Sequence, residues 1–153
     1  MGNVFLYRLG GINLGIAEEA SAIVKVFFGH EMPAGFSGAE TPLIKKAAEQ
    51  IEEYLAGKRK KFSLPLAPHG TEFQTAVWQA LRSIPYGETR SYGEIAALIG
   101  RPKAVRAVGM ANHCNPIVII VPCHRVIGSS GDLTGYGGGL PLKKRLLELE
   151  RPQ

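Results

Sequence analysis

The sequence predicts an α+β protein made of two small domains, which we place at residues 1–65 and 66–153. Two observations support this prediction. Three short segments near the N-terminus are rich in β-branched and aromatic residues, and helix-capping patterns dominate the rest of the chain. The length of 153 residues and the hydrophobic content of 45% are ordinary for a globular protein, which excludes a largely disordered chain.

The first domain begins with its strand-forming segments, which are residues 4–8, about 12–17 and about 21–28. Gly10-Gly11 is typical of a two-residue hairpin turn, so we expect a small antiparallel three-stranded sheet. Thr41 and Pro42 follow as the N-cap and first residue of a helix, and Gly57 is expected to end that helix.

The second domain is predicted to be helical. Two capping boxes, at Thr71–Gln74 and Ser91–Glu94, mark the starts of its first two helices. Gly100 closes the second helix, and Pro102 is expected to open a third helix that runs to about Asn112. Two short helices joined by a tight glycine-containing turn predict a helix-turn-helix, although many helical hairpins of this kind bind nothing.

The predicted third helix has two different faces. The residues expected to face the core are Ala104, Val105, Val108 and Ala111. The residues expected on the opposite face are Lys103, Arg106, Met110 and His113. The exposed face of the second helix of a helix-turn-helix is the face that reads DNA.

The charge pattern supports an acidic partner. The second domain holds 10 basic and 6 acidic residues, and no acidic residue lies between Glu94 and Asp132. A basic stretch without carboxylates is typical of a surface that faces phosphates. A solvated basic face is the alternative interpretation.

Reactive side chains follow the apolar run Ile117–Val121, which we interpret as a buried strand or an extended core segment. The run leads into Cys123, and a buried thiol needs a base to become a nucleophile. His124 is the only adjacent base. Glu150 ends a predicted helix over residues 141–150, where the helix dipole disfavours a carboxylate, and this position hints at another task.

Three other interpretations of Cys123 remain open. It could be an inert core thiol, or it could form a disulfide with Cys114, which a reducing cytosolic setting disfavours. The pairs His113-Cys114 and Cys123-His124 could bind zinc, but adjacent residues do not easily reach one ion.

An ordered series of motifs resembles the O6-alkylguanine-DNA alkyltransferase family. Residues 122–126, Pro-Cys-His-Arg-Val, resemble its active-site signature. Further motifs in family order are 84–89, Ser91-Tyr92, 102–104, 106–109, Ala111-Asn112, Asn115-Pro116 and Gly135-Tyr136. The resemblance covers about residues 70–150 strongly and the first 65 residues in outline. It implies a ribonuclease H-like N-terminal domain and a winged-helix-like helix-turn-helix in the second domain.

The resemblance also implies DNA repair by direct damage reversal. The protein would bind duplex DNA in the minor groove and turn an O6-alkylguanine, or an O4-alkylthymine, out of the stack. The alkyl group would then move irreversibly and stoichiometrically to Cys123. No cofactor, metal or membrane is implied, and we expect a cytoplasmic monomer, associated with the nucleoid on DNA or nuclear in a eukaryote. Cooperative binding along one duplex is left open.

Residue roles follow from the same resemblance. Cys123 would accept the alkyl group, His124 would act as base through a water molecule, and Glu150 would orient His124. Asn115 would brace the active-site segment, and Tyr92 would help to rotate and protonate the base. The implied DNA-contacting residues are Arg106, which would fill the gap left by the base, with Tyr92, Lys103, Ala107, Gly109, Ala111 and Arg125. The implied pocket residues are Val126, Tyr136, Gly137 and Met110.

Two other classes of function compete with alkyl transfer. Alkyltransferase-like proteins bind damaged DNA but lack the cysteine, so Cys123 argues against binding alone. A thiol hydrolase or a helix-turn-helix regulator would not need the joint set of motifs. Some family members hold zinc through N-terminal cysteines, and no cysteine precedes Cys114 here, so we predict no such zinc site.

Overall fold

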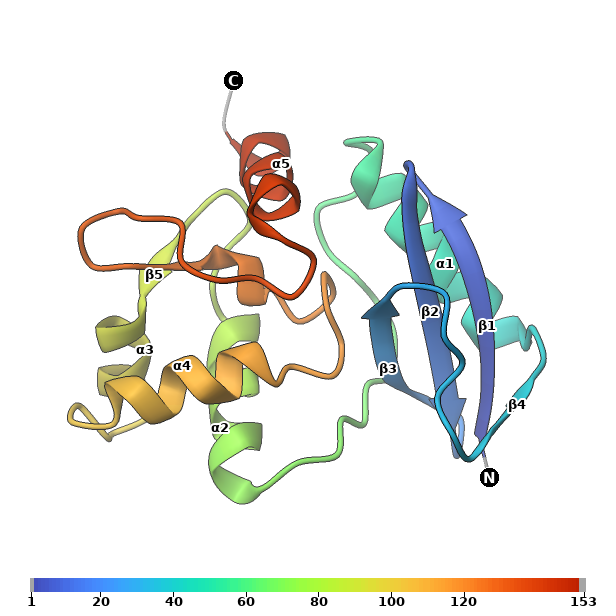
Figure 1. Ribbon diagram of the computed structural model, residues 1–153, viewed down its shortest axis with the longest axis horizontal. Helices are drawn as coiled ribbons and strands as arrows, with labels where there is room; N and C mark the ends of the chain where they lie inside the picture. Colours follow the sequence, from blue (N-terminus) through green and yellow to red (C-terminus); the bar gives the residue numbers. More distant parts are fainter. Residues whose placement is uncertain (1, 152–153) are drawn as a thin grey trace. The chain divides into compact units, whose positions relative to one another are not determined.

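The structure is a computed structural model that describes residues 2–151 and divides into two compact units (Figure 1). The first unit comprises the chain as far as His69 together with Pro116–Ile120. The second unit comprises Gly70–Asn115 and the chain from Val121 onward. Within residues 2–151, no helix is long and apolar enough to cross a membrane.

The first unit is built on a four-stranded sheet in the order β3-β2-β1-β4. Its strands are β1 Gly2–Leu9, β2 Ile12–Glu19, β3 Ala22–Phe28 and β4 Phe36–Gly38. The three predicted antiparallel strands are confirmed, and the Gly10-Gly11 turn has φ values of 55° and 80° that glycine adopts without strain. The structure adds β4, which pairs in parallel with β1 and is too short to show a strand pattern in the sequence.

One helix, α1 Pro42–Leu55, covers this sheet. The Thr41 side chain accepts a hydrogen bond from the Ile44 backbone N–H, as expected for an N-cap. Ile44, Ile51 and Tyr54 are fully buried on the inner face of the helix, so its apolar stripe forms the core of the unit.

The run Ile117–Val121 is largely buried in the core, as predicted, but it is not a strand or an extended segment, because residues 118–120 form turns. Only Ile117 pairs with the sheet, through a parallel bridge to Val26. The Val26 N–H donates to the Pro116 carbonyl at 2.9 Å, and the Val118 N–H donates to the Val26 carbonyl at 3.0 Å. The chain then turns, with Ile119 at φ 71°, and burial of the apolar side chains rather than strand pairing explains the apolar run.

The second unit holds four α-helices and a short pair of strands among the described residues. The helices are α2 Glu72–Arg82, α3 Tyr92–Leu98, α4 Val105–His113 and α5 Leu140–Glu150. Strand β5, Arg90–Ser91, pairs in parallel with β6, Val126–Ile127. Both predicted capping boxes are present, at the starts of α2 and α3.

Helix α4 begins three residues later than predicted. Residues 102–103 form a turn, so Pro102 does not open the helix, and the N-cap Ala104 offers no side-chain acceptor. Val108 and Ala111 face the core as predicted, but Val105 is 41% exposed because the later start places it in the first turn. The indole N–H of Trp78 on α2 donates to the Ala111 carbonyl at 2.9 Å, which ties α4 to α2.

Candidate active site

Cys123 is the first residue of a single 3₁₀ turn, Cys123–Arg125 (η1), which directly follows Pro122. The side-chain amide of Asn115 donates to the Val121 carbonyl at 2.9 Å, and that of Asn112 donates to the Cys123 carbonyl at 3.4 Å. The end of α4 therefore braces the backbone on both sides of Pro122. Asn115 lies where the resemblance places it, whereas the matching contact of Asn112 was not predicted from the sequence.

The Cys123 thiol is only 4% exposed, and burial raises its pKa. A hydrogen bond with the Asn115 side chain, the positive charge of Lys143 and a backbone hydrogen bond oppose this effect without reversing it. The resting residue is therefore a neutral thiol at neutral pH. Its use as a nucleophile requires a base that removes the proton.

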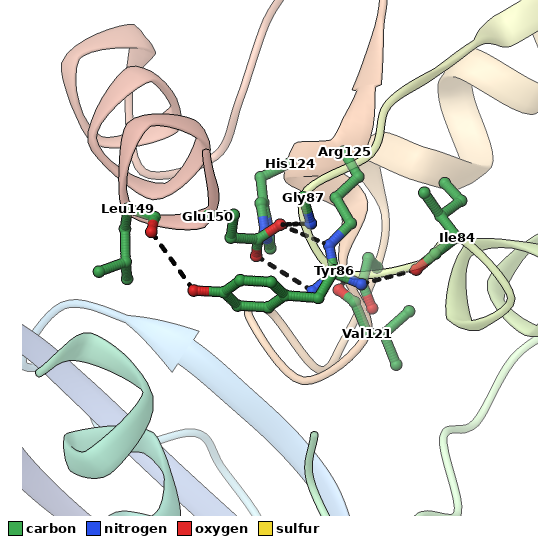
Figure 2. A network of polar contacts seen from close by, with 9 residues as sticks. Ile84, Tyr86, Gly87, Val121, His124, Arg125, Leu149 and Glu150 are labelled. Atoms are coloured by element: carbon green, nitrogen blue, oxygen red, sulfur yellow. Dashed lines mark hydrogen bonds and ion pairs between the residues drawn. The ribbon is translucent and has the colours of Figure 1, made fainter. Parts of the chain in front are cut away.

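His124 is completely buried, and its Nε2 lies 2.7 Å from the Glu150 Oε2 (Figure 2). A carboxylate only accepts hydrogen bonds, so the proton of a neutral His124 belongs on Nε2 and the lone pair on Nδ1. Burial lowers the pKa of His124, the contact with Glu150 opposes this, and Arg125 and Lys143 lower it further. The imidazole is therefore neutral and able to accept a proton.

Glu150 is 2% exposed at the C-terminal end of α5, where three residues donate hydrogen bonds to it. His124 binds Oε2, Arg125 binds both carboxylate oxygens, and the Gly87 backbone N–H reaches Oε1 at 3.4 Å. The unfavourable position in the helix dipole is thus explained by a set of buried donors. Glu150 lies against His124, as the resemblance implies.

Arg125 is buried rather than exposed, which contradicts the expectation that it contacts DNA. Its side chain is 9% exposed and donates from Nε to Glu150 Oε1 at 2.8 Å and from Nη2 to Oε2 at 3.1 Å. Nη1 donates to the Ile84 carbonyl at 2.7 Å. A carboxylate that is buried without a cation is strongly destabilising, whereas an exposed phosphate is stabilised by water. Pairing with Glu150 therefore explains why the Arg125 side chain points inward.

Lys143 on α5 is a functional candidate that the sequence did not reveal. Its side chain is fully buried, and Nζ donates to the carbonyls of Val126 at 2.7 Å and Thr134 at 3.3 Å. Burial lowers the pKa of Lys143, and the neighbouring Cys123 opposes that shift. The carbonyl of Val126, one of the implied pocket residues, therefore already accepts a hydrogen bond from Lys143.

Lys143 also changes the interpretation of α5. The side chains of α5 that are buried are those of Lys143, Leu146 and Glu150, whereas Leu142, Leu147 and Leu149 are half-buried. A lysine in a leucine-rich helix is normally an exposed residue, so the pattern gave no signal for this one.

Tyr92 contacts the loop that carries Tyr136. The Tyr92 hydroxyl, at the start of α3, is hydrogen-bonded to the Thr134 hydroxyl, and a side chain at Gly109 would be within contact distance of the Tyr92 ring. Burial raises the pKa of Tyr136 well above its ordinary value, and Cys123 and Glu150 raise it further. Gly137 is exposed beside Tyr136 in the same glycine-rich loop.

The outer surface of α4 and the turn before it carries the remaining predicted residues. Lys103, Arg106, Ala107 and Met110 are exposed, and Met110 is 65% exposed one helical turn after Arg106. Gly109 is half-buried. Ala111, which was expected to contact DNA, is 2% exposed and lies in the core, so that expectation is wrong. No group of three or more His, Cys, Asp or Glu side chains among residues 2–151 is arranged to hold a metal ion.

Comparisons with known proteins agree with this geometry. Residues 72–152 match the family described as "6-O-methylguanine DNA methyltransferase, DNA binding domain", and residues 11–68 match its "ribonuclease-like domain". The chain is 53% identical over 150 residues to the methylated-DNA–protein-cysteine methyltransferase of Methanosarcina acetivorans, covering 96% of each chain. It is 51% identical to the constitutive enzyme of that name from Bacillus subtilis, covering 89% of this chain and 87% of the relative.

A solved structure supports the same assignment. The crystal structure of Mycobacterium tuberculosis OGT in complex with DNA superposes with a TM-score of 0.90 at 46% identity, covering 97% of this chain and 92% of that one. Both domains match the family models, and the matches to the relatives span most of each chain. The chain therefore belongs to the methylated-DNA–protein-cysteine methyltransferase family.

Proposed function

We propose that this protein repairs DNA by moving the alkyl group of O6-alkylguanine to the sulfur of Cys123. One observation carries the assignment of the acceptor: a buried neutral thiol opens the turn that also holds His124, and His124 is kept neutral beside the buried carboxylate of Glu150. This arrangement supplies a nucleophile, a base and an orienting group in one site.

The transfer balances without a cofactor. His124 accepts the thiol proton through a water molecule, as the resemblance implies, and the imidazolium is stabilised by Glu150. The sulfur attacks the alkyl carbon, the bond from that carbon to O6 breaks, and its electron pair moves into the guanine ring. Guanine then takes up one proton, and a thioether remains on Cys123. Because the bond from the alkyl carbon to sulfur in a neutral thioether does not break readily, Cys123 is not regenerated and each molecule acts once.

The surface that would bind DNA is the exposed side of α4. Arg106 is exposed there, and the sequence has no acidic residue from 95 to 131 to cancel its field. Ala107 is small and exposed beside it, which suits a close approach to the minor groove. Arg106 would fill the gap left by the rotated base and offset the cost of a few kcal/mol for unstacking it.

The test is the mass of the protein after incubation with duplex DNA that contains O6-methylguanine. We expect one added methyl group per molecule, assigned to Cys123 by fragmentation of the tryptic peptide 107–125, which also contains Cys114. Cys123→Ala should bind the duplex without being modified, whereas Cys114→Ser, at the exposed second cysteine, should be modified normally. Tight binding with Cys123 unmodified would show a damage-binding protein and overturn the proposal.

A further inference from the structure

We propose that Arg125 is a positioning residue for alkyl transfer, which holds the Glu150 carboxylate ionised and in place so that His124 stays neutral until it receives the thiol proton. This inference rests on the proposed function. Arg125 does not touch the reacting atoms in the scheme above, and it would act through Glu150 and His124.

The contacts of Arg125 are those of a fixed guanidinium rather than of a surface cation. Nε and Nη2 bind the two oxygens of Glu150 at 2.8 and 3.1 Å, which is the bidentate geometry of a strong arginine–carboxylate pair (Figure 2). Nη1 binds the Ile84 carbonyl at 2.7 Å, and the guanidinium carbon lies 5.7 Å from the centre of the Tyr86 ring. Together, these contacts fix the position and orientation of the guanidinium group.

The position of Arg125 in the chain couples this pair to the nucleophile. Arg125 closes the same 3₁₀ turn that Cys123 opens, so the carboxylate is fixed relative to the thiol by two residues of backbone. The end of α5 is also held by the loop after α2. There the Gly87 N–H reaches Oε1 at 3.4 Å, and the Tyr86 hydroxyl donates to the Leu149 carbonyl at 3.3 Å.

The positive charge of Arg125 affects whether His124 and Glu150 bind an additional proton. A carboxylate that is 2% exposed needs a cation beside it. A guanidinium supplies that charge and does not give up its proton, so His124 need not become the cation in the resting state. Arg125 lowers the pKa of His124, in the same direction as the larger effect of burial.

The other groups around the site do not replace Arg125. The titratable groups that face His124 and Glu150 are Cys123, Lys143, Tyr86 and Tyr136. Lys143 is the cation among these groups, and it donates hydrogen bonds to the Val126 and Thr134 carbonyls. Without Arg125, we expect the His124–Glu150 pair to bind an extra proton at higher pH, which prevents His124 from acting as a base.

The experiment measures single-turnover transfer from duplex DNA, in full-length protein, from about pH 6 to about pH 9. Arg125→Gln removes the charge and keeps an amide donor, and Arg125→Lys keeps the charge without the bidentate fork. Arg82→Gln, at an exposed arginine in the last turn of α2, is the matched control. The pH dependence of iodoacetamide alkylation of Cys123, in a Cys114→Ser background, gives a readout that does not depend on DNA.

We expect the acid limb of the Arg125→Gln rate profile to move up by about one pH unit, so that transfer is about tenfold slower at pH values below the midpoint and recovers at alkaline pH. Arg125→Lys should keep the midpoint of the unmodified protein, as should Arg82→Gln. An Arg125→Gln profile with an unchanged midpoint, even if uniformly lower, would show a merely structural role and overturn the inference. The same shift in Arg125→Lys would also overturn it.

Circular dichroism reports whether each variant is folded. Should Arg125→Gln fail to fold, the nitrogen chemical shifts of His124 in the unmodified protein decide the question. We expect one proton, on Nε2, at neutral pH, and a doubly protonated ring there would contradict the inference. Failure of the proposed function would be recognised separately, because Cys123 of the unmodified protein would then stay unmethylated by DNA at every pH.

Discussion

Replacement of Glu150 by glutamine should strongly destabilise the second unit, although the side chain keeps its size. Glutamine presents one acceptor oxygen and one amide donor where His124 and Arg125 now find two acceptors, at 2.7 Å for Nε2 of His124 and at 2.8 and 3.1 Å for Arg125. One donor loses its partner, and the guanidinium stays buried without a counter-charge. Breaking a buried ion pair from one side costs about 3–5 kcal/mol.

The single tryptophan makes this prediction easy to measure. Trp78 is 3% exposed in the core of the second unit, so its fluorescence reports the unfolding of that unit in urea. The expected loss corresponds to a fall in the unfolding temperature of roughly 6–20 °C. The matched control is Glu148→Gln on the same helix, where an exposed carboxylate lies 3.9 Å from Lys144 and should contribute less than about 0.5 kcal/mol.

A double variant tests whether the uncompensated charge is the cause. Arg125→Gln combined with Glu150→Gln leaves two neutral amides that can bind each other. We expect the double variant to lose about 0.5–3 kcal/mol less than the sum of the two single losses. The reasoning is refuted if Glu150→Gln costs less than about 1 kcal/mol, or if the two losses simply add.

Three further predictions concern single side chains. Arg106→Ala should slow the repair of duplex DNA while the reaction of Cys123 with free O6-benzylguanine keeps its rate; an equal slowing of both would mean that Arg106 does not act on DNA. Lys143→Met removes a charge that lowers the pKa of Cys123, so the midpoint of iodoacetamide alkylation should move to higher pH, and an unchanged midpoint would contradict this. Ser91→Ala removes the acceptor of the Glu94 N–H, 3.1 Å away, and should lower the unfolding free energy by about 1 kcal/mol in urea; no loss would show that this cap is dispensable.

Local signals predicted much of the fold. The Gly10-Gly11 turn, the Thr41 cap and both capping boxes depend on residues within four positions of one another, and all of them are present. The pairing of β4 with β1 joins Phe36 to Gly2, and a three-residue strand has no periodicity that could announce it. Helix α4 begins late because Pro102 lies in a turn, and proline suits both situations.

The site divides in the same way. The resemblance led to Cys123, His124 and Glu150. In the structure, His124 is hydrogen-bonded to Glu150 and lies in the same turn as Cys123. The inward direction of Arg125 and the burial of Lys143 depend on a carboxylate and on carbonyls contributed by distant parts of the chain. Arginine and lysine are usually exposed, so the sequence alone predicts both as surface residues. Only the tertiary structure shows that both are buried against acceptors.

The bridge between Val26 and Ile117 has a consequence for any attempt to divide the molecule. Pro116–Ile120 belongs to the first unit, yet it is flanked by Asn115 and Val121, which belong to the second. A fragment that starts at Gly70 would therefore carry this apolar segment without the strand that accepts and donates its hydrogen bonds. The ordering of the backbone that leads to Cys123 is thus linked thermodynamically to the folding of a sheet that contributes no side chain to the chemistry.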